Sequence, residues 1–208
     1  MRASRVLALF AALGLFAAST VHAQMQDPEI GAPAPAFTLP DTYGNHHSLS
    51  DYAGKWVVLE WLNYGCPFVQ KFYEAGKMQE LQAEYAAKDV VWFAVVSSAP
   101  GQQGYYEPGE MNVQNEAHGI KATAVLLDPE GDVGRAYGAK TTPQMYLISP
   151  DGTLLYNGAI DNKPSANASS LEGATNYLVQ AINEAWAGQP VSEPVTRPYG
   201  CSVKYKSP

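Results

Sequence analysis

Several features that would point to other classes of protein are missing from this sequence. After residue 23 no apolar run is long enough to cross a bilayer, and neither a P-loop nor an internal repeat occurs. The 13 Lys and Arg residues are outnumbered by 20 Asp and Glu and do not cluster, which argues against nucleic acid or an anionic membrane as partner. No Cys-x-x-Cys-His segment is present, so attached haem is not expected, and no cofactor is predicted.

The first 23 residues have the organisation of a secretory signal. Arg2 and Arg5 give a positively charged start, residues 6–18 are apolar, and Val21-His22-Ala23 is a small-residue cleavage site. The alternative is an uncleaved membrane anchor, but the apolar segment is short for a membrane span. We therefore expect a cleaved leader and a periplasmic or secreted protein.

The composition of the rest predicts a folded domain rather than disorder. Hydrophobic residues make up 46% of the chain and charged residues 16%. We expect one domain over residues 24–188 and an extended tail over residues 189–208. Without Arg2 and Arg5, the 11 basic and 20 acidic side chains leave a formal net charge of −9.

Cysteine is scarce, with Cys66 in the domain and Cys201 in the tail. Two cysteines in an oxidising compartment suggest a disulfide pair. A bond closing so long a loop could add about 4–5 kcal/mol of stability in the chain-entropy model. The wide separation means that sequence alone does not bring the two together.

The segment around Cys66 organises the chain. Residues 57–62 form a short apolar run of the kind found in a buried strand, interrupted only by Glu60. After a turn at residues 63–65, Cys66-Pro67 opens a helical pattern that extends to about Ala87, with proline at the favoured first position. Cys66 is therefore predicted at the N-cap, where free N–H groups and the helix dipole favour a thiolate. The alternative is a small buried core residue.

The remaining pattern alternates strands with helices. Continuous apolarity at residues 90–97 indicates a strand buried on both faces, as in a parallel sheet with helical crossovers. Residues 98–111, rich in Gly, Pro and Tyr, are expected to be a loop. The other expected strands lie at 36–39, 124–128, 141–149 and 154–160, and the other expected helices at 112–119, 132–137 and 171–187.

The strand, turn and Cys-Pro helix resemble the active-site segment of the thioredoxin superfamily. The resemblance implies an α/β thioredoxin fold, with a central mixed sheet flanked by helices. Cys66 matches the first cysteine of the Cys-x-x-Cys motif, while Val69 stands where the second would be. Pro143 matches a cis proline that lies against the active-site cysteine, so the Thr142 backbone is implied to bind an extended partner.

Three residues near Cys66 are further candidates. Glu60 matches a buried acid that moves protons to and from the thiols of thioredoxins, since burial raises a carboxyl pKa toward neutral. The alternative is a glutamate at a solvated edge. Asn63 and Tyr64 are expected to flank the thiol, with Tyr64 as an aromatic lid. Lys71 is expected to be solvated rather than a partner of the thiolate.

A narrower resemblance is to peroxiredoxin-like redoxins of the AhpC/TSA type outside the cytoplasm. It rests on the Gly-x-Pro-x-Pro-x-Phe entry at residues 31–37, on Asn-x-x-Cys-Pro-Phe-Val at 63–69, on Ala-Ile-Asp-Asn at 159–162 and on Gly-Cys-Ser at 200–202. The first of these implies an N-terminal hairpin before the core. Cys201 either resolves the intermediate formed at Cys66 or clips the tail to the core.

Three functions remain open from the sequence. The first is a thiol–disulfide oxidoreductase with a protein thiol or disulfide as partner and an unknown electron donor. The second is a thiol peroxidase with Cys201 as resolving cysteine, although the Pro-x-x-x-Thr-x-x-Cys pattern of peroxiredoxins fails, with Leu59 and Asn63 in place of its Pro and Thr. The third is a non-catalytic binding protein with a structural disulfide.

No metal site is predicted. A copper-handling thioredoxin-like protein would pair its cysteines with a distant histidine. The candidates here are His118 and the adjacent His46 and His47, which are expected to be a surface pair in a turn.

Overall fold

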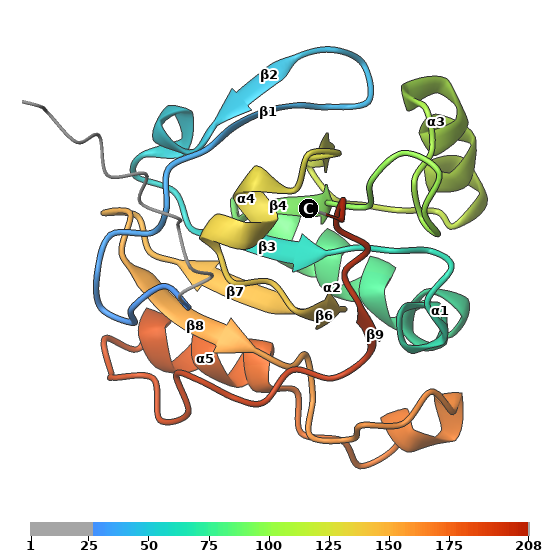
Figure 1. Cartoon of the computed structure of the whole chain (residues 1–208). Helices are drawn as coiled ribbons and strands as arrows, with labels where there is room; N and C mark the ends of the chain where they lie inside the picture. Colours follow the sequence, from blue (N-terminus) through green and yellow to red (C-terminus); the bar gives the residue numbers. More distant parts are fainter. Residues whose placement is uncertain (1–26, 208) are drawn as a thin grey trace, which may run out of the picture.

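A five-stranded mixed sheet forms the centre of the computed structural model, which describes residues 27–207 (Figure 1). The strands follow the order β5 (Ala124–Leu127), β4 (Val91–Val96), β3 (Val57–Trp61), β7 (Met145–Ile148) and β8 (Leu154–Gly158). The first three are mutually parallel, and β7 and β8 are antiparallel to their neighbours. The predicted α/β fold with a central mixed sheet is confirmed. The proposed leader at residues 1–23 lies outside the described residues.

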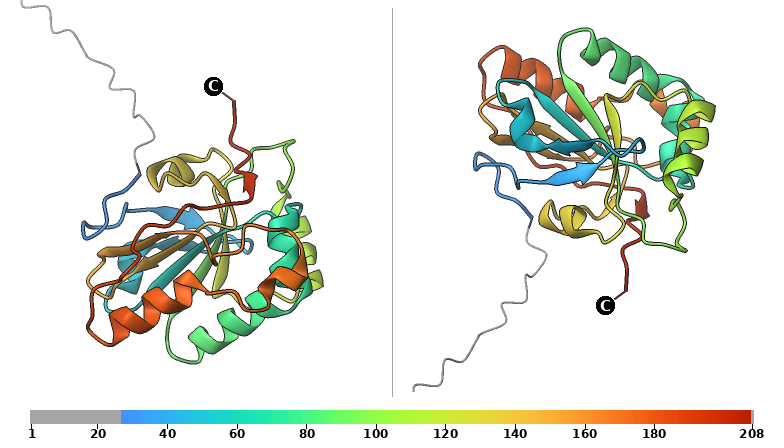
Figure 2. Two further views of the ribbon diagram at one scale, coloured as in Figure 1. Left: turned by 90° about the horizontal axis from the view of Figure 1, so that it is seen from below. Right: turned by 90° about the horizontal axis from the view of Figure 1, so that it is seen from above.

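Helices cover both faces of this sheet. Helices α2 (Lys77–Ala86) and α5 (Tyr177–Trp186) lie on one face and α4 (Asp132–Ala136) on the other, as the two views in Figure 2 show. The remaining helices are α1 (Pro67–Glu74), α3 (Pro108–Ala117) and two 3₁₀ turns, η1 (Leu49–Tyr52) and η2 (Ala168–Leu171).

Strand β3 supplies side chains to two separate cores because successive residues point to opposite faces. Val58 packs with the residues under α1, α2 and α5, whereas Val57 and Leu59 pack with the N-terminal segment and α4. All five residues of β3 are buried. Burial of each apolar side chain contributes about 1.5–3 kcal/mol, so this strand is held firmly from both sides.

Short strands extend the fold at both ends of the chain. The predicted N-terminal hairpin is present as β1 (Thr38–Pro40) paired with β2 (His46–Ser48). At the other end, β9 (Cys201–Ser202) pairs antiparallel with β6 (Thr141–Thr142). The tail thus crosses the domain, pairs with the edge of β6 beside α1, and continues past β9 toward β4 (Figure 1).

Three predicted boundaries are wrong. The helix expected up to Ala87 is broken into α1 and α2 at Gly76, whose positive φ of 71° starts the second helix. The expected loop at 98–111 contains the start of α3, where Pro108 occupies the first turn. The expected C-terminal helix begins at Tyr177 rather than 171, because Asn176 caps it by accepting from the Val179 N–H at 3.0 Å.

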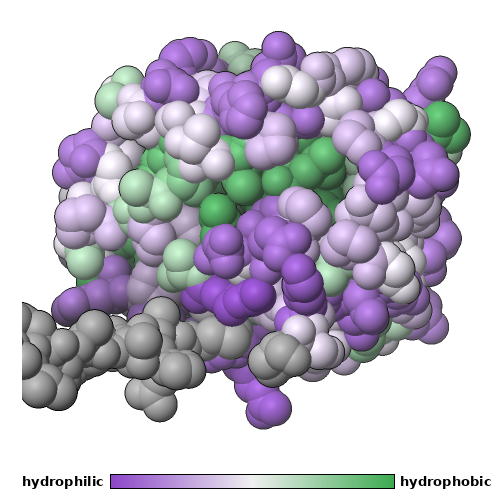
Figure 3. All heavy atoms as spheres, turned by 45° about the horizontal axis from the view of Figure 1, so that its top comes forward, coloured by the Kyte–Doolittle hydropathy of each residue, from purple (hydrophilic) through white to green (hydrophobic). Residues whose placement is uncertain are grey.

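The surface is polar over most of the face in Figure 3, where apolar side chains gather in one central hollow. No helix among residues 27–207 is both long enough and apolar enough to span a bilayer.

Candidate active site

Cys66 occupies the N-cap of α1, as the sequence predicts. Its backbone is extended (φ −88°, ψ 121°) and Pro67 begins the helix. The Cys66 carbonyl accepts from the Val69 and Gln70 N–H groups, each at 2.9 Å. The Cys66 side chain makes no cap hydrogen bond, but its position at the N-terminus of α1 exposes the sulfur to the positive end of the helix dipole. Cys66 is also fully buried, so both features that the sequence offered as alternatives occur together.

The Cys66 sulfur lies between the strand that follows α4 and the C-terminal tail. As a thiol it donates to the Thr142 carbonyl oxygen at 3.1 Å, and the Cys201 N–H points at the same sulfur from 3.4 Å. The Thr142–Pro143 peptide bond is cis, and Thr142 is paired with Cys201 across β6 and β9. Three segments that are far apart in the sequence therefore meet at one sulfur atom.

The two cysteines are both free thiols in the structure, and their environments differ. Burial opposes ionisation of Cys66, but hydrogen bonds from the Cys201 thiol and N–H and from the Val69 N–H hold its pKa below the ordinary value. For Cys201, burial and the neighbouring Cys66 sulfur raise the pKa to about 11. The geometry thus favours a thiolate at Cys66 and a protonated thiol at Cys201.

Glu60 is fully buried on the side of β3 that faces α1 and α2, so the alternative of a solvated edge is wrong. Its carboxylate accepts from Tyr73 Oη at 3.0 Å, Gln82 Nε2 at 3.0 Å and Trp92 Nε1 at 2.9 Å. Burial outweighs these three bonds and raises the pKa of Glu60 to about 7. Among the hydrogen bonds between described residues, none joins Glu60 directly to Cys66.

Asn63 and Tyr64 adjoin Cys66 in the chain, but their side chains hold the neighbouring loops. Asn63 Oδ1 accepts from the Gly65 N–H at 2.9 Å, and its Nδ2 donates to the Gln103 carbonyl at 3.2 Å. Tyr64 is buried, stacks on His118 at 4.0 Å between ring centroids, and donates to Asn115 at 3.0 Å. Tyr64 is therefore part of the interior, where its ring packs on His118 instead of forming the aromatic lid that the sequence suggests.

Lys71 is the largest departure from the sequence prediction, because its side chain is completely buried instead of solvated. Nζ lies 3.7 Å from Asp161 Oδ2 and donates to the Lys163 carbonyl at 3.0 Å, Ser170 Oγ at 3.3 Å and Tyr199 Oη at 3.2 Å. Burial lowers the pKa of Lys71, and Asp161 works against this effect. The sequence missed this group because its members come from α1, a loop and the tail.

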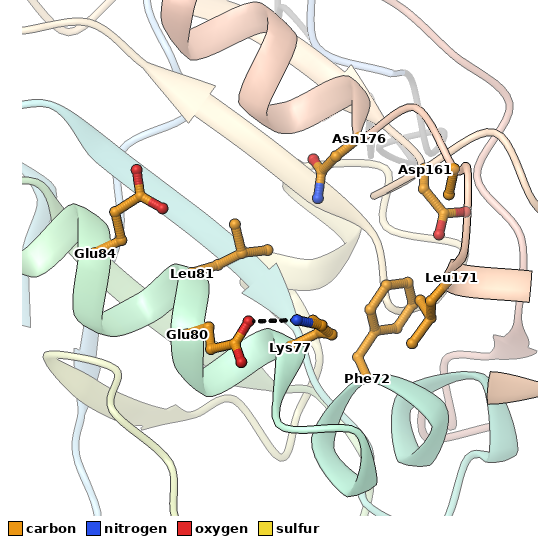
Figure 4. A pocket seen from close by; sticks show the side chains of 9 residues that line it. Phe72, Lys77, Glu80, Leu81, Glu84, Asp161, Leu171 and Asn176 are labelled. Atoms are coloured by element: carbon orange, nitrogen blue, oxygen red, sulfur yellow. Dashed lines mark hydrogen bonds and ion pairs between the residues drawn. The ribbon is translucent and has the colours of Figure 1, made fainter. Parts of the chain in front are cut away.

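A cavity of about 190 Å³ lies between α2 and the segment from 161 to 176 (Figure 4). Phe72, Leu81 and Leu171 give it apolar walls, and Lys77 bonds to Glu80 at its rim at 2.7 Å. Cys66 is not among its lining residues, so this cavity is separate from the thiol site.

Of the two histidines expected as a surface pair, His46 is exposed, whereas His47 is partly buried. His47 bonds to Tyr52 and lies 3.2 Å from Asp41. Within residues 27–207, no group of three or more His, Cys, Asp or Glu side chains is placed to hold a metal ion.

Comparison with known proteins identifies the family of this chain. The model of the AhpC/TSA family matches residues 30–157. A thiol-disulfide oxidoreductase ResA from Geobacillus thermodenitrificans is 30% identical over 155 residues, which cover 74% of this chain and 83% of that protein.

Solved structures agree with the fold. A conserved, uncharacterized protein of Geobacillus kaustophilus superposes with a TM-score of 0.75 at 27% identity, covering 86% of this chain and 94% of that one. A hypothetical protein of Sinorhizobium meliloti gives a TM-score of 0.73 at 23% identity, covering 88% and 98%. The chain folds as a thioredoxin-like protein and belongs to the AhpC/TSA family.

Proposed function

We propose that this protein is a thiol–disulfide oxidoreductase in which Cys66 attacks a disulfide and Cys201 resolves the mixed disulfide that forms. The observation that carries the proposal is the meeting of the two cysteines: the Cys201 N–H lies 3.4 Å from Cys66 Sγ, although the residues are far apart in the chain. The similarity to a thiol-disulfide oxidoreductase at 30% identity supports the reaction class.

The reaction follows from the two thiol environments. The Cys66 thiolate attacks one sulfur of a partner disulfide, forms a mixed disulfide and releases the other partner sulfur as a thiolate, which takes a proton from water. Cys201 then gives up its proton to the second departing sulfur and bonds to Cys66 Sγ. The partner gains two electrons and two protons, and the protein leaves the cycle with a Cys66–Cys201 disulfide. An external donor of two electrons, whose identity is open, returns the pair to thiols.

Thr142, Pro143 and the tail would shape where the partner binds. β9 pairs with Thr142 and covers the sulfur, so an extended partner segment can reach the Thr142 backbone only when β9 leaves it. Asn63 and Tyr64 would support this site indirectly, because their hydrogen bonds hold the loop that carries Cys66. Glu60 would act as a nearby proton store, because its pKa of about 7 allows it to change charge near neutral pH.

A disulfide-reduction assay with single-cysteine variants tests this proposal. Wild-type protein with the leader removed should catalyse reduction of a test protein's disulfide by dithiothreitol, and Cys66→Ser should abolish catalysis. Cys201→Ser should accumulate a mixed disulfide at Cys66 that is visible by mass. Equal rates for wild type and Cys66→Ser would contradict the proposal and favour a non-catalytic binding protein.

Thiol peroxidase activity is the second candidate, favoured by the AhpC/TSA match. In that reaction Cys66 would be oxidised by a peroxide to a sulfenic acid, which Cys201 would convert to the disulfide with release of water. The Asn63 side chain is engaged with Gly65 and Gln103, not with the thiol, so it does not replace the missing threonine. Peroxide consumption that depends on Cys66 and exceeds disulfide exchange would establish this function instead.

The expected leader would bring the protein to an oxidising compartment, where disulfide substrates form. We propose that residues 1–23 direct export, so that the protein works in the periplasm or is secreted. Export of a reporter fused after residue 23 tests this, and retention of that reporter inside the cell would contradict it.

A further inference from the structure

The tail that carries Cys201 is anchored by a cluster of buried polar groups, which we call the anchor cluster: Lys71, Asp161 and Tyr199. The Lys71 side chain is fully buried and the Asp161 side chain is 2% exposed. Charged groups are seldom buried unless they are paired, because removing them from water is costly. A buried pair at this position therefore calls for a reason beyond simple stability.

Each member of the anchor cluster comes from a different part of the chain. Lys71 is on α1, five residues after Cys66, and Tyr199 is in the tail, two residues before Cys201. Asp161 follows β8 and joins them: Tyr199 Oη donates to Asp161 Oδ1 and accepts from Lys71 Nζ at 3.2 Å. The cluster thus connects the element that carries one sulfur to the segment that carries the other.

The backbone between Tyr199 and Cys201 has little conformational freedom. Gly200 has a φ of 135°, and a Cβ at this position would collide with the Thr142 carbonyl oxygen. The Tyr199 ring also packs edge-on against Phe68 of α1, with 5.8 Å between ring centroids. Fixing Tyr199 therefore fixes the position of Cys201 two residues later.

We propose that the anchor cluster positions Cys201 against Cys66, so that Lys71, Asp161 and Tyr199 are positioning residues for the resolving step. This inference rests on the proposed function. In that step the Cys201 sulfur bonds to Cys66 Sγ, the bond to the partner sulfur breaks, and the Cys201 proton leaves with the partner as a thiol. The rate depends on how often Cys201 lies in line with that bond, which the anchor sets.

The arrangement of charges shows which member of the anchor cluster can be substituted without leaving a buried charge unpaired. Asp161 Oδ1 accepts from Tyr199 and from the Lys163 N–H at 2.8 Å, while Oδ2 faces Lys71. Removing Lys71 would leave Asp161 buried without its cation, which destabilises proteins strongly. Removing only the Tyr199 hydroxyl keeps the ion pair and the aromatic packing and cuts the link to the tail. Asp161 also lines the cavity in Figure 4, so the cluster has space beside it.

The test compares Tyr199→Phe with Tyr43→Phe, a tyrosine that is 79% exposed in the N-terminal hairpin. The first measurement is the equilibrium between the two thiols and their disulfide in glutathione buffers, expressed as the effective concentration of Cys201 at Cys66. The second is the alkylation rate of Cys201 in the reduced Cys66→Ser background. Urea unfolding of each variant reports stability separately.

We expect Tyr199→Phe to lower the effective concentration about tenfold and to raise the alkylation rate of Cys201 by a similar factor, since a hydrogen bond to a charged group is lost. Tyr43→Phe should change neither. Unchanged values of both quantities in Tyr199→Phe would overturn the inference, even if stability falls. The proposed function fails in a different way: wild-type protein would form no Cys66–Cys201 disulfide, while alkylation of Cys201 would still report on the anchor.

Discussion

At the scale of single residues, the site depends on which groups are buried and what they bond to. Cys66 and Glu60 both have exposed fractions of zero, yet their environments act in opposite directions. Hydrogen bonds outweigh burial at Cys66 and lower its pKa, whereas burial outweighs hydrogen bonds at Glu60. At the end of β3 the pKa of Glu60 is thus raised, and at the start of α1 the pKa of Cys66 is lowered.

The pKa of Cys66 should depend on the Cys201 thiol. Cys201→Ala removes a donor to the Cys66 thiolate, so the pKa of Cys66 should rise measurably, as followed by the ultraviolet absorbance of the thiolate. Cys201→Ser keeps a donor and serves as the control, with a pKa close to that of wild type. Identical titration midpoints for the Ala and Ser variants would show that the hydrogen bond has no influence.

Glu60 should make the stability of the fold depend on pH. A solvated glutamate has a pKa of 4.5, and burial raises the pKa of Glu60 to about 7, so between these values the unfolded chain binds fewer protons than the folded one. The contribution of Glu60 to stability therefore falls as pH rises from about 4.5 to 7, by about 3 kcal/mol. Glu60→Gln should remove this loss and gain stability relative to wild type at pH 8 but not at pH 4.5. Urea unfolding of both proteins at pH 4.5 and pH 8 checks this. An unfolding free energy that differs between Glu60→Gln and wild type by the same amount at both pH values would refute it.

At the scale of elements, the local patterns were predicted well and the long-range contacts were not. Cys66 at the N-cap and the buried strand β3 follow from signals within a few residues, namely Cys-Pro and continuous apolarity. The hairpin β1–β2 was implied by the resemblance of residues 31–37 to the entry segment of redoxins. Lys71 was mispredicted because a lysine near the middle of a helix is usually solvated. Its partners Asp161 and Tyr199 lie 90 and 128 positions further on, where no local pattern connects them to α1.

The short pairing of β6 with β9 should be sensitive to Gly200. Gly200→Ala would place a Cβ against the Thr142 carbonyl oxygen, so the tail should detach and alkylation of Cys66 should become at least about tenfold faster. Gly173→Ala is the matched control, because Gly173 also has a positive φ of 65° but its Cβ would meet no atom within 4 Å. Both variants should lose about 1 kcal/mol from backbone strain, and only the first should change the reactivity of Cys66. Equal reactivity in the two variants would mean that β9 does not shield the sulfur.

At the scale of the whole molecule, the alternation of apolar strands with helices made the α/β class predictable, and the resemblance to the thioredoxin superfamily implied the central mixed sheet. The path of the tail was not predictable, since an extended segment with few apolar residues has no periodic pattern that indicates which elements it packs against. The structure places residues 196–206 against β8, β6 and the loop after β4, through bonds such as Tyr205 Oη to the Ala139 carbonyl at 2.7 Å and Ala99 N–H to the Lys204 carbonyl at 2.8 Å. The pairing of Cys66 with Cys201 as a disulfide stays a prediction.

The reduction potential of the Cys66–Cys201 pair tests the central claim most directly. Protein without its leader would be equilibrated in glutathione buffers of graded potential, and the fraction of thiols trapped by alkylation would be measured. A cycling oxidoreductase predicts that the disulfide forms and opens near about −200 mV, in the range of exchange catalysts. A disulfide that stays closed below about −300 mV would be a structural clip, and the claim that Cys201 resolves a mixed disulfide at Cys66 would be contradicted.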